Sequence, residues 1–514
     1  MYSYKKSSLF STVYITILLH AKLTQCIFKH IISLIDKFSV YIPNEREIAL
    51  KLAASKDGHG DEDRQRSNEL LKEALQITWP AFIELVMSTL FGMVDMIMVG
   101  QVSPSAIAAV GLTNQPFMLL IAVFAALNVG TTTLVAWNIG ARDLKKARIV
   151  TRQSLTVGTT LGIVISIIGL FSARYIIIFM GAKSDTIGPA TQYFQIISAG
   201  LVFQVITMAV TSALRGAGET RIPMLYNVGA NLFNVFGNYV LIYGKLGFPA
   251  LGVTGAAIST DVARILACLA GLYILFFSRK TKLALTVKGD YRPDFDTIKQ
   301  VFKIGIPAAA EQFVLQSGLI LFARTVSGLG TATYAAHQIG LNINGLTFSP
   351  SQAFGVAATT MVGQSLGAND IKKANECANL IHKMGMAVAC FVGLMFILFS
   401  HPIARLYTND LAVAAMAGTV LKIMALAQPG QSTQLVLAGA LRGAGDTMYP
   451  LYASALGIWV FRVVMAYIFV NIFGWGLIGA WVAMVLDQYT RSAIVYMRYR
   501  SGKWKYIKSR VDME

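Results

Sequence analysis

The chain has 514 residues, of which 55% are apolar and only 14% are charged, and its net charge is +18. A soluble domain of this length needs more charge to cover its surface, so the composition excludes an ordinary soluble protein. The basic residues fall in short loops between long apolar runs, so the positive charge does not indicate a nucleic-acid partner.

The first 68 residues differ from the rest of the chain. Lys5 and Lys6 precede an apolar run over 9–19 that is too short to span a bilayer, and the stretch 57–66 is polar. We predict that 1–68 is an N-terminal extension, disordered or lying at the membrane interface. A targeting segment is the remaining alternative.

Apolar blocks of about 20 residues follow, the length that crosses a bilayer core. Lipid offers no partner to backbone polar groups, so each block is predicted to be a helix. The expected spans are 76–99, 113–137, 153–173, 190–213, 222–244, 252–277, 302–326, 339–362, 380–400, 413–438, 449–471 and 476–497.

These spans define the predicted domains. Residues 69–277 form an N-terminal lobe of six helices and 302–497 form a C-terminal lobe of six helices. The charged stretch 278–301 is a cytoplasmic linker between the lobes, and 498–514 is a basic cytoplasmic tail. Lys and Arg gather in every second loop, which places both termini in the cytoplasm of a plasma-membrane protein.

The two lobes repeat each other at a fixed offset. Pro80–Glu84 matches Pro307–Glu311 at 227 residues, and the same offset relates Gly140–Ala147 to Gly367–Ala374. The segment from Ala213 to Thr220 matches the one from Ala440 to Thr447 in the same register. Each half has an even number of spans, so the repeats are parallel. The predicted fold class is an all-α integral membrane protein of twelve transmembrane helices in two parallel-related six-helix lobes.

Three further motifs stand out: Phe91-Gly-Met-Val-Asp95 running to Gly100, Ala335-Ala-His337-Gln338-Ile339, and the paired Leu-Arg-Gly-Ala-Gly loops at 214–218 and 441–445. In these motifs the chain resembles the multidrug and toxic compound extrusion (MATE) family, over residues 70–500. The resemblance implies a V-shaped pair of lobes. It also implies export of drug-like, often cationic, compounds driven by Na⁺ or H⁺.

One set of polar residues in the first lobe stands at positions that are apolar in the second lobe. Asp95 stands at the position of Phe322, and Asn234 and Asn238 stand at the positions of Phe461 and Met465. Asn231 likewise corresponds to Ile458, and Thr260 to Met484 at an offset of 224. Ionisable groups in spans are costly and indicate function.

A carboxylate, amide oxygens, a hydroxyl and a backbone carbonyl are the hard ligands of a small cation. We therefore predict a cation-coupling site, a possible Na⁺ site, from Asp95, Asn234, Asn238, Thr260 and the carbonyl of Ala256. The resemblance implies the same ion site for Asp95, Asn234, Asn238 and Thr260.

Glu84 and Glu311 obey the repeat, each four residues after a proline. Two roles stay open for them, a proton relay and a structural bond to a neighbouring helix end. Gln338, His337, Asn342 and Met96 are candidates for the substrate pathway, because they lie where the lobes are expected to meet.

The predicted function is a secondary antiporter that exports small organic compounds by alternating access. The expected partners are these substrates and the lipid bilayer, for a monomer that has no resident cofactor and is not an enzyme. A flippase for a lipid-linked saccharide is the alternative, disfavoured because no arginine cluster lies in the spans expected to face between the lobes. An intramembrane enzyme is a further alternative, for which catalytic motifs are lacking.

Overall fold

The computed structural model describes residues 61–507 except 183, 279, 280, 287, 288, 290 and 409, and every regular element there is helical. Contacts divide the chain into Met1–Asn68 and Glu69–Glu514. Only the last few residues of the predicted extension are described, as the start of a helix, and the end of the predicted basic tail lies outside the described residues.

The first half consists of long helices joined by short turns. Their bounds are α3 Asp61–Gly100, α4 Pro104–Gly140, α5 Leu144–Phe179, α6 Ser184–Ala199, α7 Leu201–Gly216, α8 Arg221–Tyr243 and α9 Gly252–Phe277. Side-chain caps define several of the starts. Ser103 accepts from the backbone N–H of Ala106, and Asp143 accepts from that of Lys146.

The second half has the same succession with one distorted helix. Its elements are α10 Phe295–Ser327, α11 Thr331–Gly367, α12 Ile371–Arg405, α13 Leu411–Gly443, α14 Met448–Ala455, η1 Leu456–Val464, α15 Met465–Tyr467, η2 Ile468–Ile472, α16 Gly476–Arg500 and η3 Lys503–Tyr506. The segments α14, η1, α15 and η2 follow one another without a break, and η1 and η2 are π-helical.

Every predicted span except 190–213 corresponds to one continuous helical segment, but the correspondence with membrane spans is coarser. Eight helices of the described part are long and apolar enough to cross a membrane, or nine if the bent pair α6 and α7 is one span. That pair replaces the single predicted span at 190–213 and bends by 43° at Gly200. The helices α8, α11 and α16 do not qualify, because they carry many polar side chains. The chain is thus a multi-pass membrane protein.

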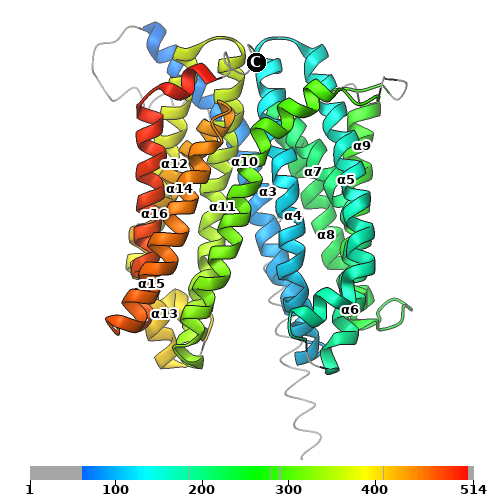
Figure 1. Ribbon diagram of the computed structural model, residues 1–514, viewed down its shortest axis with the longest axis vertical. Helices are drawn as coiled ribbons and strands as arrows, with labels where there is room; N and C mark the ends of the chain where they lie inside the picture. Colours follow the sequence, from blue (N-terminus) through cyan, green and yellow to red (C-terminus); the bar gives the residue numbers. More distant parts are fainter. Residues whose placement is uncertain are drawn as a thin grey trace, which may run out of the picture. The chain divides into compact units, whose positions relative to one another are not determined.

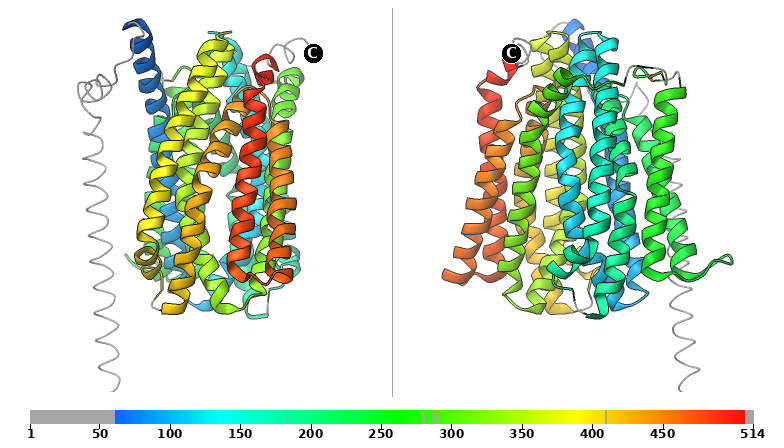
Figure 2. Two further views of the ribbon diagram at one scale, coloured as in Figure 1. Left: turned by 90° about the vertical axis from the view of Figure 1, so that its left-hand side faces the viewer. Right: turned by 45° about the vertical axis from the view of Figure 1, so that its right-hand side comes forward.

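The two halves meet along four central helices. Figures 1 and 2 show α3, α4, α10 and α11 between the α5–α9 group and the α12–α16 group. Leu70, Ala74 and Ile77 of α3 pack in one core cluster with residues of α11. Glycines bring α4 and α11 together, since a Cβ on Gly140 would overlap the backbone oxygen of Gln364, and one on Gly367 that of Trp137.

Hydrogen bonds between the halves cluster where α4 and α11 end. We call this the basic end, because Lys145, Lys146, Lys372 and Lys373 follow there. Four side chains donate to backbone oxygens of the opposite half: Thr133 Oγ1 to Arg442 (2.9 Å), Trp137 Nε1 to Gly443 (2.8 Å), Thr360 Oγ1 to Arg215 (2.9 Å) and Gln364 Nε2 to Gly216 (2.9 Å). Because 360 and 364 follow 133 and 137 by the repeat offset of 227, the four bonds form two symmetric pairs.

The close approach of α4 and α11 yields a stability test. Gly140→Ala places a methyl group against the backbone of α11, and overpacking of this kind lowers stability by about 1–3 kcal/mol. Gly111→Ala on the same helix is the matched control, because no atom lies within 4 Å of its added Cβ. Thermal unfolding of the purified variants in detergent should show a lower Tm for Gly140→Ala alone. Equal Tm values for both variants would contradict the importance of this contact.

Candidate functional site

Asp95 lies on α3 against two amides of α8. The Asn238 side chain donates from Nδ2 to Asp95 Oδ1 at 2.6 Å. When the Asn234 amide is oriented to satisfy its bonds, its nitrogen donates to both Asp95 oxygens at 2.9 Å. Asn234 and Asn238 are four residues apart and buried, so one face of α8 presents both to the carboxylate. The Asn238 carbonyl oxygen is buried without a hydrogen-bond partner.

Helix α9 completes the group. In the same orientation the Asn234 oxygen accepts from the backbone N–H of Thr260 at 3.1 Å and from its hydroxyl at 3.3 Å. The Thr260 hydroxyl also lies 2.9 Å from the carbonyl oxygen of Ala256 and donates to it. Gly237 permits this contact of α8 with α9, because a Cβ there would lie 2.5 Å from the Ser259 hydroxyl oxygen.

The structure therefore brings Asp95, Asn234, Asn238, Thr260 and Ala256 into one connected group, as the sequence pattern predicted for their positions. Asn231 is not part of it. Its amide donates to the Ser88 hydroxyl at 3.3 Å, and Ser88 precedes Asp95 on α3.

One neighbour was not foreseen from the sequence. Tyr193 of α6 packs beside the buried cluster of Val99, Ala106 and Ala256, within electrostatic range of Asp95. Its segment is separate from the motifs, so no spacing signal indicated it.

The four acids that are buried within the helices of the described part each face an arginine. The pairs are Glu84 with Arg215 (2.9 Å), Asp261 with Arg264 (3.0 Å), Glu311 with Arg442 (2.6 Å), and Asp487 with Arg462 (2.6 Å) and Arg491 (2.8 Å). Among the residues that the structure describes, Asp95 forms no ion pair and accepts hydrogen bonds from amides instead. No neighbouring arginine therefore neutralises Asp95 when it is ionised, unlike the four paired acids.

Glu84 and Glu311 sit in matching environments. Asn227 donates to Glu84 at 2.6 Å, and Ser454, at the equivalent position of the repeat, donates to Glu311 at 3.0 Å. The arginine partner of each acid stands near the end of α7 or α13, where its backbone oxygen accepts a hydrogen bond from the opposite half. Each acid thus joins its own helix to the helix that carries its arginine, near the basic end.

The four pathway candidates do not gather at Asp95. Met96 is exposed on α3, and Asn342 is exposed on α11. Gln338 donates to the Tyr334 hydroxyl at 2.8 Å. His337 is fully buried among the rings of Phe322, Tyr334 and Trp481, so it faces the interior of the second half in this conformation.

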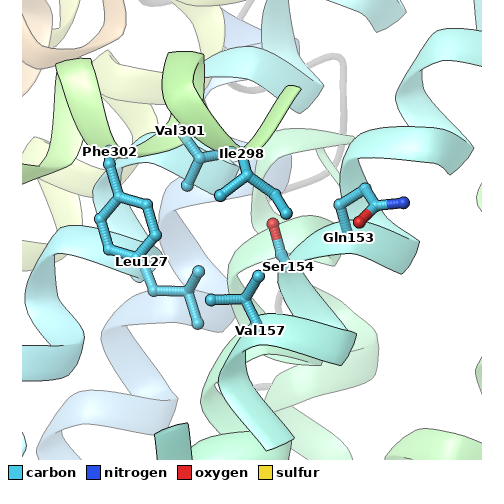
Figure 3. Close-up of a pocket in the computed structure, with 7 residues that line it drawn as sticks. All are labelled: Leu127, Gln153, Ser154, Val157, Ile298, Val301 and Phe302. Carbon is cyan, nitrogen blue, oxygen red and sulfur yellow. The ribbon is translucent and has the colours of Figure 1, made fainter. Parts of the chain in front are cut away.

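A gap between α4, α5 and α10 is separate from this group (Figure 3). It is lined mostly by apolar side chains, among them Leu127, Val157 and Phe302, and it is too narrow to hold a water molecule. Gln153 at its rim donates to the backbone oxygen of Arg292 at 2.7 Å. The gap has neither the room nor the charge expected of a substrate site.

A repeated helical membrane protein with a polar group buried in one half has the build of a secondary transporter. The sequence profile of the MatE family matches residues 80–240 and 307–468, one segment in each half. The chain belongs to this family of transporters, and the resemblance predicted from its motifs is confirmed.

Comparisons with individual relatives support membership of this family. The chain is 32% identical over 437 residues to a probable multidrug resistance protein NorM of Thermotoga maritima, which covers 85% of this chain and 94% of the relative. It is 29% identical to the multidrug resistance protein PmpM of Pseudomonas aeruginosa, over 76% of this chain and 82% of that one. A solved outward-facing multidrug resistance MATE transporter of the MOP superfamily superposes with a TM-score of 0.79 at 26% identity, covering 84% of this chain and 96% of that one.

The paired acids give a testable stability effect. Glu311→Gln leaves the Arg442 guanidinium largely buried without its counter-charge, at an expected cost of about 2–4 kcal/mol. We expect a lower Tm in detergent and a fall in transport in proportion to folded protein. The double variant Glu311→Gln/Arg442→Gln should recover much of the Tm, because no charge is then left unpaired. Equal destabilisation in single and double variants would argue against the ion pair.

Proposed function

We propose that the chain is a secondary antiporter that exports small organic, drug-like and often cationic compounds in exchange for a cation. The names of its relatives support drugs as the substrate class. The observation that carries the coupling mechanism is Asp95, a carboxylate among apolar helices with amide partners and no paired arginine.

The ligands around Asp95 fit a small hard cation. The unpartnered Asn238 oxygen, the Asn234 amide and the Thr260 hydroxyl lie with the carboxylate in one connected group. The Ala256 carbonyl is bonded to Thr260 at the edge of this group. One formal negative charge with several neutral oxygens is a shell suited to Na⁺, and we propose Na⁺ as the coupling ion. A proton on Asp95 is the alternative, since an amide takes up no proton.

We further propose twelve spans arranged as two six-helix lobes, with the basic end in the cytoplasm. The excess of Lys and Arg at that end supports this orientation. The polar helices α8, α11 and α16 then cross the membrane with their polar faces inside the protein. The paired bonds of Thr133 and Thr360 close the lobes on the cytoplasmic side, and alternating access requires these bonds to break when that side opens.

The structure gives little support to the flippase alternative. Arg462 and Arg491 do come together in the second half, but both are buried and share Asp487. A pyrophosphate carrier calls for arginines that reach a large anionic headgroup. Dye efflux from a sensitised bacterium distinguishes the exporter from the flippase.

Asp95→Asn tests the coupling site. The change removes the one negative charge of the group while keeping its size, so we expect insertion and folding to persist and gradient-driven efflux to be lost. Asn231→Ala is the matched control, because Asn231 shares the helix with Asn234 and Asn238 but bonds to Ser88. Efflux of a fluorescent dye should be normal in the control, with both variants expressed equally. Wild-type efflux in Asp95→Asn would refute the coupling role.

Asn234→Ala and Thr260→Ala separate the two ions. Each removes a neutral oxygen from the proposed Na⁺ shell, so half-maximal efflux in vesicles should need at least several-fold more Na⁺. A site that works by protonation of Asp95 tolerates both changes with modest loss. The decisive measurement is wild-type efflux along a proton gradient without Na⁺. Undiminished efflux under that condition would overturn the sodium proposal and leave protonation of Asp95 as the coupling step.

A further inference from the structure

The second half contains a buried cluster with an excess of positive charge. Arg462 of η1 and Arg491 of α16 share a single carboxylate, that of Asp487. All three side chains are less than one-tenth exposed. An arginine stays protonated in proteins, so the cluster carries one net positive charge.

Other acids of the described second half do not balance this charge. Glu311 pairs with Arg442, and Asp446 pairs with Arg498. Asp370 and Asp410 cap the starts of α12 and α13. A buried charge is costly when no counter-charge accompanies it, so the cluster calls for an anion from outside the chain.

Several donors next to Arg462 are buried and lack acceptors. Arg462 Nε and Trp481 Nε1 have no acceptor, and neither ring nitrogen of His337 has a partner, one of them being an N–H donor in the neutral imidazole. His337 and Trp481 are 0% exposed. Shared ring contacts connect them. The Arg462 guanidinium carbon lies 5.8 Å from the Phe322 ring centre, the His337 ring lies 5.6 Å from the same centre, and Trp481 lies 5.6 Å from His337. Buried donors nearly always have partners, so this group is built to receive an acceptor.

The internal repeat shows that the cluster is special to this half. Phe322 occupies the position that Asp95 has in the first half, and Arg462 lies over its ring. The helix that carries Arg462 is π-helical over 456–464, whereas its counterpart α8 is an ordinary α-helix. Such π segments are frequent at functional sites. Gly457 lets this segment approach the pair, because a Cβ there would lie 2.5 Å from Asp487 Oδ1.

We propose that the second half holds a binding site for a small monovalent anion, a halide or a carboxylate group, between Arg462, His337 and Trp481. One excess positive charge matches one negative charge. Guanidinium, imidazole and indole N–H groups are suitable donors to either ligand. The site thus has the opposite polarity to the Asp95 group in the first half.

Equilibrium binding of radioactive chloride to the purified full chain in detergent tests the proposal. The medium contains only the bulky sulfonate isethionate as the other anion. We expect saturable binding of about one chloride per chain. Arg462→Gln should weaken it at least ten-fold, and Trp481→Phe, which keeps an aromatic ring beside His337 but loses the N–H, several-fold. Arg264→Gln is the matched control, since Arg264 belongs to the neutral pair with Asp261 in the first half.

Competition separates the two ligand chemistries. Displacement of chloride by bromide but not by acetate assigns the site to an inorganic halide, and displacement by acetate as well assigns it to carboxylates. Absence of saturable chloride binding in the wild type, or unchanged binding in both Arg462→Gln and Trp481→Phe, would overturn the proposal. Asp95→Asn should bind chloride normally, so failure of the coupling site and failure of the anion site give different results.

Discussion

A charge among apolar helices needs an opposite charge beside it, because lipid offers no water to solvate it. This constraint accounts for the ion pairs that join α3 to α7, α10 to α13, and η1 to α16 through Glu84, Glu311 and Asp487. Breaking such a pair leaves a buried charge, so the pairs hold helices together even where the pair itself contributes little net stability. Asp95 departs from the pattern, and the departure distinguishes it from the structural acids.

Comparison of the two repeats distinguishes contacts that occur in both halves from polar groups that occur in only one. Bonds present in both halves lie at the basic end, and they keep their geometry even when the residue changes. Trp137 and Gln364 are chemically different, yet each donates an N–H to a glycine carbonyl of the opposite half. Polar groups present in only one half lie elsewhere, around Asp95 in the first half and Arg462 in the second. Two lobes with one shared frame can therefore carry different chemistry, because the frame depends on the repeated bonds alone.

Much of this arrangement was predictable from the sequence. Apolar runs located the helices, the offset of 227 gave the repeat, and helical spacing together with the family resemblance grouped Asn234 and Asn238 with Asp95 and Thr260. These features depend on local periodicity or on residue types that are rare in lipid, so the chain itself carries the signal.

Other features depend on contacts between distant segments and gave no signal. The bend at Gly200 occurs without a proline, where the chain packs against Asp261 of α9. The bonds from Thr133 and Thr360 end on backbone oxygens, which every residue possesses. Polar residues lower the mean hydropathy of α8, α11 and α16. The spans that contain the most polar side chains are therefore the hardest to recognise as spans from the sequence.

The two amides beside Asp95 are chemically suited both to an ionised carboxylate and to a bound cation. An amide has a donor at one end and an acceptor at the other, of nearly the same size. With nitrogens turned toward Asp95, Asn234 and Asn238 stabilise an ionised carboxylate. In the proposed coupling mechanism, the same side chains turn their oxygens inward and become ligands of a cation that the carboxylate attracts. A second aspartate at position 238 would instead repel Asp95 until a cation or proton arrived. Under that proposal the amide lowers the cost of the state between release of one cation and capture of the next.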